Sequence, residues 1–308
     1  MMLQEPLRIG IIGTDTSHAI AFTRMINDVN DHHYVPGGKV VAAYPGGSSD
    51  FPLSASRVDG FMETLEKEFG VARVGTLEAL AWQCDAYLLL SADGRVHLEQ
   101  LRAIVPCRKP VFIDKPLALS IKEAKSIFEL ANQWDVPIMS SSSLRFLEPL
   151  VQDLDENGRQ QVTAASVQGS LAVEPTQSRY FWYAIHAVEL LYAIMGPGCR
   201  EVRAERDATG DRLVGVWQDG RIGEAICRAD GDDRFLAQLD RSGVLTKLDA
   251  AQSATPFYAS LMAKIIPFLQ TGRSPVHWRE TVEIIVFLEA AEKSLAAGGT
   301  PQPVVGVL

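Results

Sequence analysis

A cation stands at the end of a short apolar run near the middle of the chain. Val111 to Ile113 is typical of a buried strand, and Asp114-Lys115-Pro116 follows directly. Ligands of open α/β sheets bind outside the carboxyl ends of the strands, so Lys115 stands where a substrate would lie. Pro116 restricts Lys115 to an extended backbone. An ammonium group there can stabilise a developing oxyanion, and the ordinary alternative is a solvated surface lysine.

The elements that must position Lys115 alternate between strand and helix. Buried strands are indicated at 7–12, 39–44, 86–91, 110–113 and 136–140. Helices are expected between them, at about 19–29, 58–69, 97–105 and 121–134. This order requires a parallel sheet with right-handed crossovers. The sequence therefore predicts an α/β fold whose residues 1–143 form a Rossmann-like, doubly wound domain.

Residues 144–308 have a different pattern. A strand is expected at 161–167 and a helix at about 180–195, followed by strand-sized segments. Turn signals such as Gln-Asp-Gly220 and Arg-Ser-Gly243 separate these segments, which is typical of an antiparallel meander. A last helix is expected at 280–296. The second domain is therefore predicted to be α+β, with a mainly antiparallel sheet.

Size and composition exclude several classes of protein. A chain of 308 residues is long enough for two cores, and a net charge of −9 argues against a nucleic-acid partner. No window approaches the roughly 18 apolar residues of a membrane span, and the first residues do not resemble a signal peptide. The four cysteines match no metal or redox spacing, so we expect reduced thiols and a cytoplasmic location. Asp15, His18, His32 and His33 do not place three ligands on one element, so no metal is predicted.

Several motifs together resemble the glucose-fructose oxidoreductase and inositol dehydrogenase family (Gfo/Idh/MocA). Asp114-Lys115-Pro116 is a conservative variant of the family's Glu-Lys-Pro. Ser91-Ala-Asp-Gly-Arg-Val-His97 is similar to Thr-Pro-Asn-x-x-x-His, with Asp93 and His97 in matching places. Leu144-Arg145-Phe146 is similar to the Arg-Phe after the last Rossmann strand. His186 with Glu189 resembles the family's helix histidine followed three residues later by an acid.

The resemblance implies NAD or NADP on the first domain and a sugar-like or polyol substrate between the domains. Lys115 would orient the substrate and stabilise an alkoxide, and His186 would exchange the hydroxyl proton. Tyr183 is a further catalytic candidate, and Arg145, Ser143 and Glu189 are substrate-binding candidates; Glu189 either orients the imidazole or faces water. A homo-oligomer, dimer or tetramer, would form through the second sheet at residues 202–248.

The turn after the first strand departs from the family fingerprint Gly-x-Gly-x-x-Gly. The aligned residues are Gly13-Thr14-Asp15-Thr16-Ser17-His18, so only the first glycine is kept, and Asp15 places a carboxylate near the expected pyrophosphate. One of residues 15–17 is expected to cap the following helix, whose N–H groups still offer an anion site. The predicted cofactor-binding residues are Gly13, Thr14, Asp15, Thr16, Ser17, His18, Tyr44, Ser91, Asp93, His97, Asp114 and Lys115.

Two further departures leave alternatives open. Tyr44 ends the second strand, at a position where an acid would indicate NAD and a nearby arginine would indicate NADP, so the choice of cofactor stays open. Tyr44 itself either stacks on adenine or is a core residue. Trp182 stands where many family members have an aspartate. The leading hypothesis is an NAD(P)-dependent oxidoreductase acting on a secondary hydroxyl. The alternative is a relative without ordinary dehydrogenase turnover: a ligand-binding or sensing protein, or a lyase or glycosidase-like enzyme that retains its nicotinamide.

Overall fold

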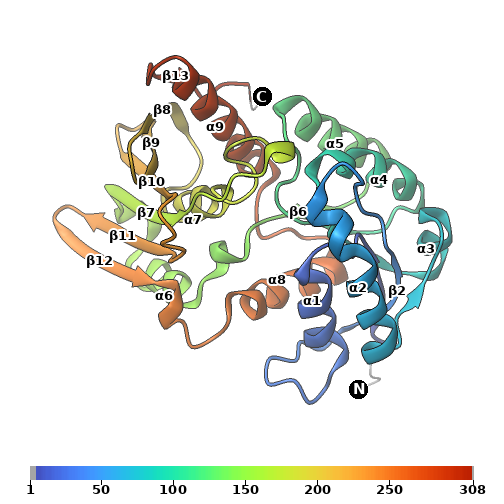
Figure 1. Ribbon diagram of the computed structural model, residues 1–308. Coiled ribbons are helices and arrows are strands. Elements are labelled where there is room, and N and C mark those ends of the chain that lie inside the picture. Colours follow the sequence, from blue (N-terminus) through green and yellow to red (C-terminus); the bar gives the residue numbers. More distant parts are fainter. Residues whose placement is uncertain (1–4, 307–308) are drawn as a thin grey trace. The chain divides into compact units, whose positions relative to one another are not determined.

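The computed structural model describes residues 5–306 and divides the chain into two units (Figure 1). The first unit contains the chain up to Ala118, then Lys122–Ser140 and Leu261–Val276. The second contains Leu119–Ile121, Ser141–Ser260 and the residues from His277 onward. The predicted α/β class, with one parallel and one mainly antiparallel sheet, is confirmed.

The sheet of the first unit has six parallel strands in the order β3-β2-β1-β4-β5-β6. These are β3 (Ala72–Arg73), β2 (Gly38–Tyr44), β1 (Leu7–Ile12), β4 (Ala86–Leu89), β5 (Val111–Ile113) and β6 (Ile138–Ser140). This is the strand order of doubly wound dinucleotide-binding folds. Four of the strands are buried along most of their length, as parallel sheets covered on both faces require.

Helices connect these strands, and local sequence fixes their ends. They are α1 (Ser17–Asn27), α2 (Pro52–Phe69), α3 (Leu77–Gln83), α4 (His97–Ile104) and α5 (Ile121–Trp134). The side chain of Thr16 caps α1 by accepting a hydrogen bond from the N–H of His18 at 3.3 Å, which confirms the expected cap. Gly70 ends α2 in the left-handed conformation, with φ of 65°.

A sixth helix, α8 (Phe257–Thr271), returns to the first unit from its fifth residue onward. The sequence predicted one domain boundary at residue 143 and no helix here. The helix carries apolar side chains that are almost fully buried, among them Met262 and Ile265. The amide of Gln270 donates to the carbonyl oxygen of Gly37 at 3.4 Å, just ahead of β2. Figure 1 shows this orange helix beside the blue elements of its unit.

The second unit is built on a seven-stranded sheet in the order β12-β11-β7-β10-β9-β8-β13. The strands are β7 (Ala164–Ser170), β8 (Cys199–Arg206), β9 (Gly210–Trp217), β10 (Ile222–Arg228), β11 (Leu236–Arg241), β12 (Val244–Asp249) and β13 (Gln302–Pro303). All neighbouring pairs are antiparallel except β7 with β10. Ser242 and Gly243 join β11 to β12 with positive φ at both residues, as tight hairpin turns require.

Three helices complete this unit: α6 (Glu148–Asn157), α7 (Ile185–Met195) and α9 (Trp278–Ala296). α7 packs on β7 and β10, and α9 packs on β8. The helix expected at 180–195 begins only at Ile185, because residues 180–184 form turns in which the N–H of Ile185 bonds the carbonyl oxygen of Tyr180. Trp182 and Tyr183 therefore lie ahead of α7 rather than on it.

Candidate functional site

The turn between β1 and α1 keeps the close approach that its single glycine allows. Gly13 has φ of 88°, and a Cβ atom added to it would lie 2.4 Å from the backbone nitrogen of Ser91. The N–H groups of Gly13 and Thr14 donate to the carbonyl oxygens of Tyr44 and Pro45 at 3.0 and 2.8 Å. No other residue type fits at position 13, so this glycine has the structural role of the first fingerprint glycine.

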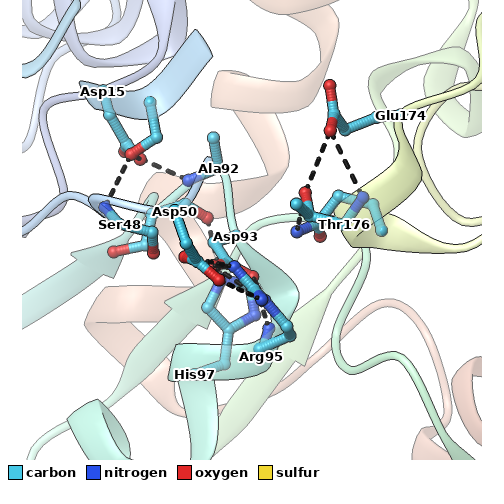
Figure 2. A network of polar contacts seen from close by, with 12 residues as sticks. Asp15, Ser48, Asp50, Ala92, Asp93, Arg95, His97, Glu174 and Thr176 are labelled. Carbon is cyan, nitrogen blue, oxygen red and sulfur yellow. Dashed lines mark hydrogen bonds and ion pairs between the residues drawn. The ribbon is translucent and has the colours of Figure 1, made fainter. Parts of the chain in front are cut away.

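The carboxylate of Asp15 is enclosed by protein donors. Asp15 is 1% exposed; its Oδ2 accepts from the hydroxyl of Ser54 at 2.6 Å and its Oδ1 from the N–H of Ala92 at 3.1 Å. Figure 2 shows this carboxylate between the segments that follow β2 and β4. The Asp15 carboxylate therefore links the first turn of α2 to the segment after β4.

His18 pairs with Asp114 in the interior of the first unit. The Nδ1 atom of His18 lies 2.5 Å from Oδ2 of Asp114, and the imidazole stacks on Phe22 with ring centroids 5.0 Å apart. Burial alone would raise the pKa of Asp114, but His18 and Lys115 outweigh burial and hold this pKa below its ordinary value. Asp114 is therefore an ionised acceptor, so Nδ1 of His18 carries the proton of this bond.

Lys115 follows β5 as predicted, beside this pair. Its backbone N–H donates to Oδ1 of Asp114 at 2.9 Å. Burial lowers the pKa of Lys115, and the Asp114 carboxylate offsets part of that shift. One carboxylate thus contacts both the imidazole from α1 and the backbone of the lysine, which fixes the segment on which Lys115 stands.

The segment after β4 contains the other residues of the predicted cofactor site. His97 is fully buried, and its ring nitrogens lie 2.8 Å from the carbonyl oxygen of Ser91 and 3.1 Å from that of Leu117. Asp93 is 1% exposed and binds Arg95. The hydroxyl of Ser91 is buried, and no hydrogen-bond partner for it occurs within residues 5–306.

These residues fit a dinucleotide. The turn at Gly13 leaves no room for a Cβ atom, the first turn of α1 begins beside it, and the orphaned hydroxyl of Ser91 lies against that glycine. Helix N–H groups and small turn residues are what bind a pyrophosphate in Rossmann domains. Asp15 does not oppose this fit, because its oxygens already accept from Ser54 and Ala92.

In the second unit, His186 is held by Ser142. The Nδ1 atom of His186 lies 2.7 Å from Oγ of Ser142, which also accepts from the N–H of Leu144. The ring of Tyr183 meets the imidazole edge to face, with centroids 5.3 Å apart, and Phe235 meets it at 5.9 Å. Tyr183 is therefore next to His186, as predicted, although it lies on a turn. Sequence reasoning chose Ser143 and missed its neighbour Ser142.

Arg145 forms a buried ion triad with two glutamates. Its Nε donates to Glu189 at 2.9 Å and its Nη1 to Glu280 at 2.5 Å, and all three side chains are at least nine-tenths buried. Burial opposes the charge of Arg145, but the two carboxylates outweigh burial and raise its pKa. Burial raises the pKa of Glu189 despite Arg145. Glu189 thus contacts the arginine, where the sequence suggested that it orients the imidazole or faces water.

The predicted site residues therefore form two sets. The cofactor candidates and Lys115 belong to the first unit, and His186, Tyr183, Arg145, Ser143 and Glu189 belong to the second. Ser143 is buried at the start of a 3-10 turn, Ser143–Phe146. No group of three or more His, Cys, Asp or Glu side chains within the described range could hold a metal ion. Within the same range, no helix has the length and apolar character to cross a membrane.

Strand order and the turn at Gly13 define the first unit as a dinucleotide-binding Rossmann domain. Residues 7–141 match the model of the oxidoreductase family with an NAD-binding Rossmann fold, GFO_IDH_MocA. The match lies within the first half of the chain and confirms the family resemblance that the motifs of this half indicated. A comparison with curated protein sequences finds no match.

Solved structures share the fold over almost the whole chain. A probable dehydrogenase from Thermotoga maritima is 18% identical with a TM-score of 0.77, covering 98% of this chain and 100% of its own. The apo scyllo-inositol dehydrogenase from Lactobacillus casei is 14% identical with a TM-score of 0.78, covering 99% and 100%. The same enzyme with bound NAD(H) and scyllo-inositol is 13% identical with a TM-score of 0.77, covering 98% and 100%.

Proposed function

We propose that this protein is an NAD(P)-dependent oxidoreductase that removes hydride from a secondary hydroxyl of a sugar, cyclitol or related polyol. The observation that carries the proposal is Lys115 at the end of β5, held through Asp114 beside the dinucleotide turn. The binding of scyllo-inositol by a structural neighbour from Lactobacillus casei favours a polyhydroxylated substrate.

The chemistry divides between two groups of this chain. A bound nicotinamide supplies the hydride acceptor. The Lys115 ammonium orients the substrate hydroxyl and stabilises the alkoxide as the proton leaves. His186 accepts that proton at Nε2. This role requires Nδ1 to carry a proton and donate to Oγ of Ser142, which fixes the tautomer. Tyr183 packs against the imidazole and limits its rotation.

The first test is calorimetric titration of the purified protein with NAD(H) and NADP(H), after a check for carried-over cofactor. Micromolar binding followed by a polyol screen is expected to give a substrate that produces reduced nicotinamide absorbance. Lys115→Met is expected to abolish that turnover with unchanged unfolding, while Lys122→Met, an exposed lysine of α5, retains it. Absence of affinity for either nucleotide in the folded, cofactor-free protein would contradict the proposal and favour a non-redox ligand.

We also propose a homo-oligomer, dimer or tetramer, that forms through the second sheet between residues 202 and 248. Alternate residues of β9 and β10 are buried, and those between them remain partly accessible on the other face. Light scattering at micromolar concentration is expected to give at least twice the mass of one chain, and a monomer would refute this.

All four cysteines are unbridged, which supports the further proposal of a cytoplasmic location.

A further inference from the structure

An ion cluster joins the two segments that flank the dinucleotide turn. Residues 45–51 follow β2 and residues 90–97 follow β4, and these strands are the two neighbours of β1 in the sheet. A Cβ atom on Gly46 would lie 3.5 Å from Cα of Gly13, so the segment after β2 lies against the turn. Figure 2 shows Asp50, from the first segment, in contact with Arg95 from the second, which also binds Asp93.

Arg95 is held between these two carboxylates. Its Nε and Nη2 donate to Asp93 at 2.9 and 2.7 Å, and its Nη1 and Nη2 donate to the two oxygens of Asp50 at 2.8 Å each. The hydrogen bonds to Asp93 and Asp50 raise the pKa of the guanidinium. With the further contact of Nε to the other oxygen of Asp93 at 3.1 Å, five side-chain contacts serve these two acids, so the positive charge of Arg95 is already neutralised.

Asp50 differs from Asp93 in its accessibility. The side chain of Asp93 is 1% exposed and that of Asp50 is 65% exposed. Each oxygen of Asp50 takes one N–H from Arg95, and a carboxylate has about four acceptor positions. Its outer lone pairs therefore remain able to accept from a ligand hydroxyl, while the bidentate contact holds the carboxylate in one orientation.

The charges around the turn disfavour an additional phosphate. Asp50 and Asp93 carry two negative charges against one positive charge on Arg95, the only lysine or arginine in residues 44–51 and 90–97. The 2′-phosphate of NADP would add about two more negative charges. Rossmann domains that bind NAD place an acid beyond β2 to accept from the ribose 2′-hydroxyl, whereas those that bind NADP use an arginine.

We propose that Asp50, oriented by Arg95, selects NAD over NADP. This inference rests on the proposed function, because it concerns the cofactor of that reaction. Asp50 supplies the acid that Tyr44 does not provide at the end of β2, and Asp93 prevents Arg95 from serving as a phosphate ligand. Arg57, which is exposed on α2, is the first lysine or arginine that follows β2 in the sequence.

The test is calorimetric titration of the cofactor-free protein with NAD and with NADP, for the wild type, Asp50→Asn and Asp59→Asn. Asp59 is the matched control, because it is also an exposed carboxylate of this unit paired with an arginine, Arg73. The wild type is expected to bind NAD at least about tenfold more tightly than NADP. Asp50→Asn should reduce that ratio by about three- to tenfold, and Asp59→Asn should leave it unchanged.

The possible results of this titration distinguish a failure of the Asp50 proposal from a failure of the proposed function. Tighter binding of NADP than of NAD by the wild type would overturn the role of Asp50, most clearly if Arg57→Ala abolished that preference. The proposal that the protein is an oxidoreductase would still stand. An equal ratio in wild type and Asp50→Asn, with melting curves that show both folded, would overturn it as well. Binding of neither nucleotide would overturn the proposed function, and this inference with it.

Discussion

Replacement of Arg145 by alanine tests whether the buried triad of the second unit is structural. In the wild type the guanidinium contacts Glu189 and Glu280 in a site where all three side chains are at least nine-tenths buried. Alanine removes both contacts and leaves the two carboxylates without the guanidinium that bridges them. The sequence suggested a substrate contact for Arg145, which predicts a different result.

The magnitude follows from the burial of the partners. Removal of one member of a buried ion pair costs about 3–5 kcal/mol, since the remaining charge is uncompensated. For a unit of this size each kcal/mol lowers the melting temperature by roughly 2–4 °C, so the expected loss is about 6–20 °C. The surface pair Arg200 and Glu201 gives the control, because Arg200→Ala should cost less than about 1 kcal/mol.

The pH dependence gives a second readout. Burial raises the pKa of Glu189 above its ordinary value even with Arg145 present, and without the arginine this pKa rises further. A carboxyl group whose folded pKa is raised contributes most stability below its unfolded pKa and loses that contribution as pH rises through the folded pKa. The penalty of Arg145→Ala should therefore be smaller at pH 5 than at pH 8.

The assay is urea and thermal unfolding of wild type, Arg145→Ala and Arg200→Ala. Neutralising the whole triad, with Arg145→Met, Glu189→Gln and Glu280→Gln combined, should restore most of the lost stability. A loss below about 1 kcal/mol in Arg145→Ala, together with a raised KM and unchanged kcat, would refute the structural role and support substrate contact.

Two further predictions concern the buried groups of both units. His18→Ala should lower the free energy of unfolding by about 1.5–3 kcal/mol above pH 5, because the ionised Asp114 loses a charged hydrogen bond. Since the folded pKa of Asp114 is depressed, this loss of stability should shrink below pH 4. A loss that stays the same below pH 4 would contradict an ionised Asp114 as the partner of His18. In the native protein at pH 8, a thiol reagent should react first with Cys107. This is the only half-exposed cysteine among the described residues. Burial raises the pKa of Cys84 to about 11 and the pKa of Cys199 and Cys227 to about 12, so these three thiols should react slowly. Rapid modification of any of them would contradict this prediction.

The sequence predicted the first sheet well because its signals are local. Apolar runs marked the longer strands, and Gly70 and Thr16 marked helix ends through their own backbone and side-chain preferences. The two-residue strand β3 was missed, since so short a strand has no periodicity. The start of α7 was placed five residues early, because the turn at 180–184 depends on hydrogen bonds that no spacing pattern shows.

Site residues were predicted by type more readily than by partner. Lys115 and His186 could be chosen from motifs, but the contacts that orient them link positions far apart in the chain. Asp114 meets His18, which is 96 residues away, and His186 meets Ser142, which is 44 residues away. Only the folded chain reveals that Asp15 accepts from Ala92, and hence that its carboxylate is compatible with a neighbouring nucleotide.

The return of α8 to the first unit has a consequence for the order in which the two units can fold during translation. The last strand of the parallel sheet ends at Ser140, but the unit lacks Leu261–Val276 until residue 276 has been translated. At roughly 5–20 residues per second, those 276 − 140 = 136 further residues take about 7–27 seconds. During that time the surface that receives Met262 and Ile265 stays uncovered, so the Rossmann unit cannot complete its packing before most of the second unit has been synthesised.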